Sequence, residues 1–222
     1  MKFPNALKGV SKIYTAEILA LIAAFVIVLA IIFGACGIGF ADVGEETVGG
    51  ILALGALVFV LAFTVLTVIS YVINIVGFSA ASKDEPAFKR ALIAIVVGIV
   101  AIILAAVFSN KDTTAAKIIS SLASAVSTAC ELLITFYCID GIKNLAVKLD
   151  KGAVKAKADK AVTLIYASYI ISIICKLVHD FSQTDASDIV SGIFGLVAIV
   201  FSIIAYCVYM SLLRNAKKML AE

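Results

Sequence analysis

The sequence predicts an all-helical integral membrane protein, built as one bundle of six transmembrane helices that spans residues 1–222. Of the 222 residues, 63% are hydrophobic and only 15% are charged, whereas a soluble domain averages about 45–50% apolar and about 25% charged residues. The apolar residues also fall into blocks of about 20, the length that a helix needs to cross the hydrocarbon layer. Lys and Arg collect in alternate connections between these blocks, as expected for a chain that crosses repeatedly.

The six blocks are predicted to be the transmembrane helices. In chain order they are Ile18–Phe40, Gly50–Ile73, Ala91–Phe108, Ile118–Ile139, Ala161–Val178 and Ile189–Leu213. The first block follows three lysines, as a signal peptide would, but it is longer than the apolar region of a signal peptide. We therefore expect it to be retained as a span.

Two connections contain recognisable helix boundaries. Pro86 is a suitable first residue for the third helix, because proline already has helical φ and its missing N–H is not needed there. The segment Gly141–Lys160 is predicted to extend the fourth helix beyond the membrane. That extension should end at Asp150-Lys151-Gly152, with glycine supplying the C-cap. Neither side of the membrane has a connection long enough for a soluble domain.

The distribution of charge predicts the topology. Fifteen of the 18 Lys and Arg residues lie in the N-terminal segment, the second and fourth connections and the C-terminal segment. The odd connections contain acidic residues instead, beginning with Asp42, Glu45 and Glu46. By the positive-inside rule both termini are expected to be cytoplasmic. Short loops and cysteines within the spans are compatible with the plasma membrane of a bacterium.

A weak internal repeat and several small-residue stripes bear on how the helices pack. Phe136-Tyr137-Cys138 and Ala205-Tyr206-Cys207 each precede a basic residue followed by asparagine, which suggests three consecutive helical hairpins. In lipid, close backbone approach brings helices together. The clearest stripe of small residues lies on the third block: Ala91, Ala94, Gly98, Ala101 and Ala105.

The fourth block differs from the others because polar residues recur along it at helical spacing. They are Ser120, Ser124, Ser127, Glu131, Thr135 and Cys138. A polar face that contains a carboxylic acid is unfavourable against lipid. We therefore expect it to face other helices or a hydrated cavity.

Glu131 is the most informative single residue, and two interpretations of it remain open. Burial would favour its neutral form, so it could serve a proton- or cation-coupled transport path. Alternatively, it is a neutral, hydrogen-bonded structural residue. Its expected partners come from the second and fifth blocks. The candidate intramembrane polar site comprises Glu131, Ser124, Ser127, Thr135, Tyr166, Ser168, Tyr169 and Asn74.

The fourth connection is rich in lysine. A basic cluster beside the membrane attracts anionic lipids of the inner leaflet with about 1 kcal/mol per Lys, although it could act only as a topology determinant. The predicted lipid-contacting residues are Lys143, Lys148, Lys151, Lys155, Lys157 and Lys160. Asp140 is expected to pair with Lys143 or Asn144, one turn along the helix.

Composition and motifs exclude several classes of function. His179 is the only histidine, and the five cysteines form no C-x-x-C pair, so neither a metal site nor a disulfide framework is expected. No enzymatic or cofactor-binding motif is present, and a net charge of +3 is too small to suggest nucleic acid. We expect a transporter, or a membrane subunit of a transport complex for a small solute or ion. The alternative is a non-transporting scaffold or regulatory subunit with a membrane-protein partner.

Overall fold

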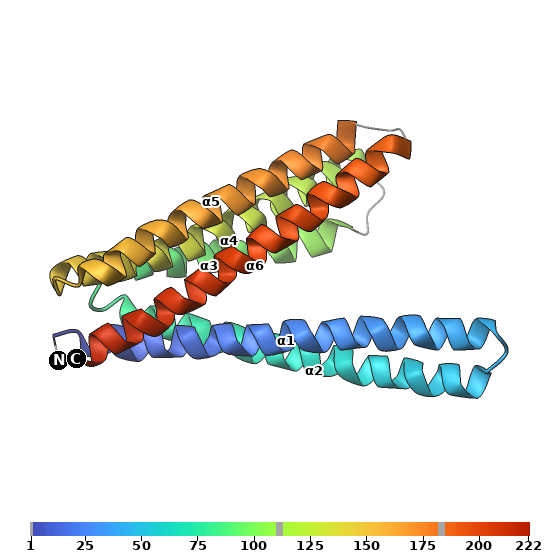
Figure 1. Ribbon diagram of the computed structural model, residues 1–222, viewed down its shortest axis with the longest axis horizontal. Helices are drawn as coiled ribbons and strands as arrows, with labels where there is room; N and C mark the ends of the chain where they lie inside the picture. The colour runs from blue at the N-terminus through green and yellow to red at the C-terminus, as the bar shows by residue number, and fades with distance from the viewer. Residues whose placement is uncertain (1, 110–112, 182–184) are drawn as a thin grey trace. The chain divides into compact units, whose positions relative to one another are not determined.

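The computed structural model describes residues 2–109, 113–181 and 185–222, except for the side chains of residues 41 and 172–196 (Figure 1). Within these ranges the chain forms six α-helices. They are α1 (Pro4–Asp42), α2 (Glu46–Ala81), α3 (Pro86–Ser109), α4 (Thr114–Lys148), α5 (Gly152–Phe181) and α6 (Asp185–Ala221).

Five helical segments in the described part of the chain are long and apolar enough to cross a membrane. They belong to α1, α2, α3, α4 and the part of α6 from Val197 onward. Large apolar side chains such as Phe25, Ile31 and Leu54 are 65–67% exposed, as expected for surfaces in contact with lipid. The chain is therefore a membrane-embedded helical protein. The end of the fifth predicted span, Ala161–Val178, has side chains that lie outside the described residues. The same holds for Cys175 and His179. The six-span count therefore remains a prediction.

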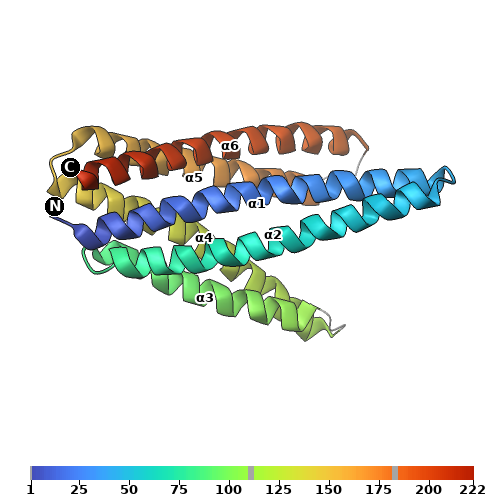
Figure 2. The same ribbon diagram turned by 90° about the horizontal axis from the view of Figure 1, so that it is seen from below.

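The chain divides into two compact units. Unit 2 comprises Ser11–Gly77, in which α1 and α2 run antiparallel (Figures 1 and 2). A Cβ added to Gly37 on α1 would lie 3.1 Å from the carbonyl oxygen of Gly49, so the two backbones approach closely near their connecting turn. Further along, Ser70 donates a hydrogen bond of 2.8 Å to the backbone carbonyl of Ala16. Small residues and one buried hydroxyl thus join the pair.

Unit 1 comprises Met1–Val10 and Phe78–Glu222. In it α3 packs against α4, α5 packs against α6, and α4 also contacts α5 and α6. The small-residue stripe of α3 forms its contact face, since Ala91, Ala94, Gly98 and Ala101 are buried. A Cβ at Gly98 would lie 3.3 Å from the Cβ atom of Cys130 on α4. Close backbone approach therefore joins α3 to α4, as predicted from the stripe.

Large buried side chains concentrate where the helices extend beyond the predicted spans. The six helices start earlier or end later than the apolar blocks, and the extensions in unit 1 share a core, here called the basal core. Its fully buried members outside the blocks include Ala6, Val10, Phe78, Phe88, Ile142, Leu145 and Ala216. Helix ends rather than connections build this layer.

The helix boundaries at the basal core follow local chemistry. Pro86 is the first residue of α3, as predicted. The extension of α4 is also confirmed, but glycine does not end it. Asp150 adopts a left-handed φ of 54°, and Lys151 N–H donates to the carbonyl of Ala146 at 2.8 Å, which is the Schellman arrangement. Gly152 instead begins α5.

Candidate functional site

The polar face of α4 does not face a single environment. Ser127 and Cys138 are buried, Ser120 donates to the carbonyl of Ala105 on α3 at 3.2 Å, and Ser124 and Glu131 are exposed. The face turned toward α3 is set by the close approach of Cys130 to Gly98. Because this contact lies about 80–100° around the helix from Glu131, the predicted stripe falls at the edge of the buried face rather than in its middle.

Glu131 lies halfway along α4, and the helices of unit 1 leave its side chain exposed. Tyr169 on α5 is close enough to interact with it electrostatically. Thr135, one turn along α4, donates its hydroxyl to the backbone carbonyl of Glu131 at 3.2 Å and so does not solvate the carboxyl group. Tyr169 is thus a predicted partner that the charge of Glu131 influences.

The remaining predicted partners lie elsewhere. Ser168 is buried and donates to the carbonyl of Ile165 on its own helix at 2.8 Å. The ring of Tyr166 lies 6.2 Å from that of Phe136 and is 44% exposed. Asn74 belongs to unit 2, where its buried Oδ1 atom has no hydrogen-bond partner among the described residues. Its predicted partnership with Glu131 remains a prediction.

The contact between α4 and α5 near this site is closely packed. A hollow of about 10 Å³ is lined by Leu132, Phe136, Ile139, Val162, Ile165 and Tyr166. It has room for about one water molecule, and its lining is apolar apart from the tyrosine. Glu131 lines none of the three hollows described in unit 1.

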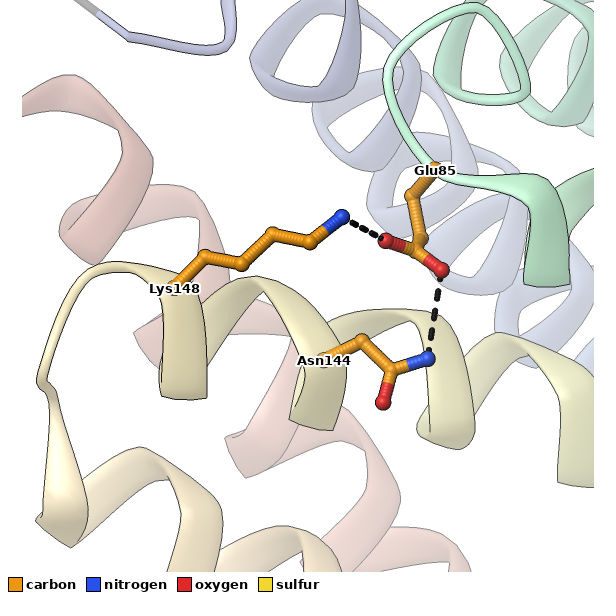
Figure 3. Close-up of polar contacts among 3 residues, drawn as sticks. All are labelled: Glu85, Asn144 and Lys148. Atoms are coloured by element: carbon orange, nitrogen blue, oxygen red, sulfur yellow. Dashed lines mark hydrogen bonds and ion pairs between the residues drawn. The ribbon is translucent and has the colours of Figure 1, made fainter.

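A second polar cluster, at the basal core, was not predicted as a site. Glu85 precedes α3, and its side chain is 6% exposed. It accepts a hydrogen bond from Asn144 at 3.1 Å and forms an ion pair with Lys148 at 2.6 Å (Figure 3). Asn144 and Lys148 are four residues apart on α4, so they share a face. That spacing indicates two donors on one face of α4, but it does not show that they meet Glu85.

Asp84, the residue before Glu85, binds the start of α1. Its carboxylate accepts from the backbone N–H of Ala6 at 2.7 Å and from the side-chain amide of Asn5 at 3.0 Å. Lys148 in turn lies 5.9 Å from the ring centre of Phe3. The Glu85 and Asp84 contacts therefore join the first turn of α1, the loop before α3 and the end of α4.

The predicted lysine cluster separates into paired and unpaired members. Lys143 pairs with Asp159 on α5, Lys148 with Glu85, and Lys151 with Glu222, each at 2.6 Å. Lys143 and Asn144 thus have partners on other elements, and the expectation that one of them pairs with Asp140 was wrong. Helix packing brought these more distant partners within reach.

The other three lysines of the cluster are exposed. Lys157 donates to the hydroxyl of Ser211 at 3.3 Å. Lys155 and Lys160 have no ion pair with any described residue. The lysines available to an external anion are therefore on α5 rather than at the end of α4.

Comparison with known proteins does not assign the chain to a family. No protein-family model, curated protein or solved structure matches it. A functional assignment therefore depends on the polar residues around Glu131 and on the charged residues at the basal core.

Proposed function

We propose that the chain is a membrane subunit of a complex that transports a small solute or ion, with Glu131 at the contact between this chain and its partner. The observation that supports this assignment is the exposure of a carboxyl group halfway along a helix that is long and apolar enough to cross a membrane.

A charged carboxylate at mid-membrane costs several kcal/mol against lipid. Glu131 influences Tyr169 electrostatically, but the helices of unit 1 leave the side chain of Glu131 exposed. A second protein surface, or a hydrated path formed with it, would remove this cost. Acidic residues at such depth commonly take part in proton and ion pathways, which favours transport over other roles of a membrane subunit.

Site-specific photo-crosslinking in native membranes tests the partner contact. A photoreactive residue at position 131 should yield a protein adduct, whereas one at Leu133 should not. Leu133 is also exposed and lies at nearly the same depth, but it faces about 200° away around α4. Equal adducts at both positions, or an adduct only within the same chain, would contradict the proposal.

Proton flux after a pH jump, measured in vesicles from the same membranes, tests the transport role. Glu131→Gln keeps the size and removes the titratable proton, so flux should fall about tenfold or more. Thr128→Ala is the matched control, since Thr128 is an exposed polar residue of α4 that lies outside the candidate site. Unchanged flux in Glu131→Gln would rule out this role for the residue.

The second candidate function is a non-transporting scaffold or regulatory subunit. The closely packed contact between α4 and α5, with its hollow of only about 10 Å³, favours this alternative. It predicts a crosslink at position 131 without any effect of Glu131→Gln on flux.

We also propose that the lysine-bearing end of unit 1 lies at an anionic inner leaflet, with both termini in the cytoplasm of a bacterial cell. The supporting observation is that Lys155 and Lys160 are exposed and have no ion pair with a described residue. Membrane-impermeant labelling of cysteines introduced at these two positions in intact cells tests the orientation. Labelling from outside would contradict it.

A further inference from the structure

A hollow of about 310 Å³ lies between the start of α5 and the end of α6. Its polar lining comes from Lys151, Lys157, Asn215, Lys218 and Glu222, and Met219 contributes an apolar wall. Small-molecule sites in proteins usually measure about 300–1,000 Å³. The hollow is therefore large enough for a small ligand or a lipid headgroup.

The charge of the lining favours an anion. Three lysines line the hollow against one acid, and all three are exposed rather than neutralised by burial. The amide of Asn215 can donate a further hydrogen bond. Lys157 and Lys218 come from different helices, so their two ammonium groups can approach one anion from separate sides.

The one acidic residue in the lining is Glu222. The side chain of Glu222 is 65% exposed, yet its carboxylate contacts the ammonium group of Lys151 at 2.6 Å. Lys157 and Lys218 have no ion pair with a described residue. The carboxylate thus occupies one of three cationic positions and leaves two available.

We propose that this hollow binds a phosphate group, supplied either by the headgroup of an anionic phospholipid or by a soluble phosphate compound. Several ammonium groups around one hollow suit a ligand with three or four acceptor oxygens better than a carboxylate, which has two. Met219 and the side chain of Val154 line the same hollow and can contact the carbon part of a phosphate ester. The assignment does not depend on Glu131 or on transport.

Binding to the full chain in nanodiscs tests the proposal. One arm titrates inorganic phosphate and pyrophosphate into phosphatidylcholine nanodiscs. The other arm measures lipid retention by native mass spectrometry after reconstitution with phosphatidylglycerol. Binding in the first arm identifies a soluble phosphate as a ligand, and binding in the second identifies a headgroup. Binding in neither arm would overturn the proposal.

Matched charge variants separate a discrete site from general surface attraction. Lys157→Gln with Lys218→Gln should weaken binding about tenfold or more, the loss expected for charge-assisted hydrogen bonds. Lys83→Gln with Lys89→Gln removes the same charge from exposed lysines that do not line the hollow, and should weaken it by less than about threefold. Equal losses would overturn the proposal. All four lysines are exposed, so both variants should fold, which their melting temperatures check.

Removal of the Glu222 carboxylate should strengthen phosphate binding rather than weaken it. Glu222→Gln releases Lys151 and should raise affinity several-fold. Asp150→Asn removes a nearby negative charge that does not line the hollow, and asparagine tolerates the positive φ at that position. A rise that is equal in both variants would show that only overall charge matters, and would contradict the proposal.

Discussion

Asp84 caps the first turn of α1 although 78 residues separate it from Ala6, whose N–H it binds at 2.7 Å. A carboxylate at this position satisfies a backbone donor that the helix itself cannot and lies at the positive end of the helix dipole. The loop before α3 thus supplies an N-cap that α1 lacks in its own sequence.

Asp84→Ala should lower stability by about 1–2 kcal/mol, the range for the loss of an N-cap together with its charge. The melting temperature in detergent, and the hydrogen exchange of the first turn of α1, measure the effect. Lys83→Ala is the control because Lys83 is exposed beside it. Equal shifts in the two variants would show that the cap contributes nothing.

The pair of Glu85 and Lys148 should show energetic coupling. Lys148→Met leaves a nearly buried carboxylate without its cation, which should cost about 1–3 kcal/mol. The loss falls below that of a fully buried pair because the side chain of Lys148 is 47% exposed. In a double-mutant cycle, Lys148→Met added to Glu85→Gln should cost clearly less than it does alone. Strict additivity would disprove the coupling.

Gly141 should not tolerate a side chain. A Cβ atom there would lie 2.8 Å from ring atoms of Phe88, and Phe88 is fully buried, so its ring has nowhere to move. Gly141→Ala should therefore destabilise the fold by about 1–3 kcal/mol through overpacking. Gly152→Ala, where nothing lies within 4 Å, should be neutral or slightly stabilising. Thermal unfolding of the two variants side by side decides the matter.

The contact between Lys151 and Glu222 should depend on pH. The hydrogen bond and charge of Lys151 lower the pKa of Glu222 below its ordinary value. Its contribution to stability is therefore complete above the pKa of the unfolded chain and is lost as pH falls through the lower, folded value. NMR titration of the Glu222 carboxyl group should show this low pKa, and Lys151→Met should return it to the ordinary range. An unchanged titration would show that the pair does not form in solution.

The sequence predicted the features that depend on composition and local spacing. Apolar blocks identified five helices that are long and apolar enough to cross a membrane. The stripe through Gly98 identified the contact face of α3, and Pro86 identified the start of that helix. Contacts between distant segments could not be predicted in this way. The pairing of Glu85 with Asn144 and Lys148, and the cap from Asp84, depend on which helix ends meet, and spacing along one helix does not encode that.

The candidate site was predictable only as a set of residues. Helical spacing puts Ser127, Cys138 and Glu131 on one arc of α4, but it does not give the rotation of that arc relative to α3, and only Ser127 and Cys138 are buried. The close approach at Cys130 decides this rotation, and it leaves Glu131 exposed. Glycine at the end of α4 was the reasonable expectation, yet Asp150 adopts the left-handed conformation because short polar side chains also tolerate it.

The basal core implies that one polypeptide is held together by two different driving forces. Phe78, Phe88 and Leu145 are buried beyond the ends of the predicted apolar blocks, where expulsion of water would drive their packing. Between α3 and α4 in lipid, close contact at Gly98 replaces that force. Urea, which weakens the burial of apolar groups from water, should loosen the ends of the helices before it separates their membrane portions.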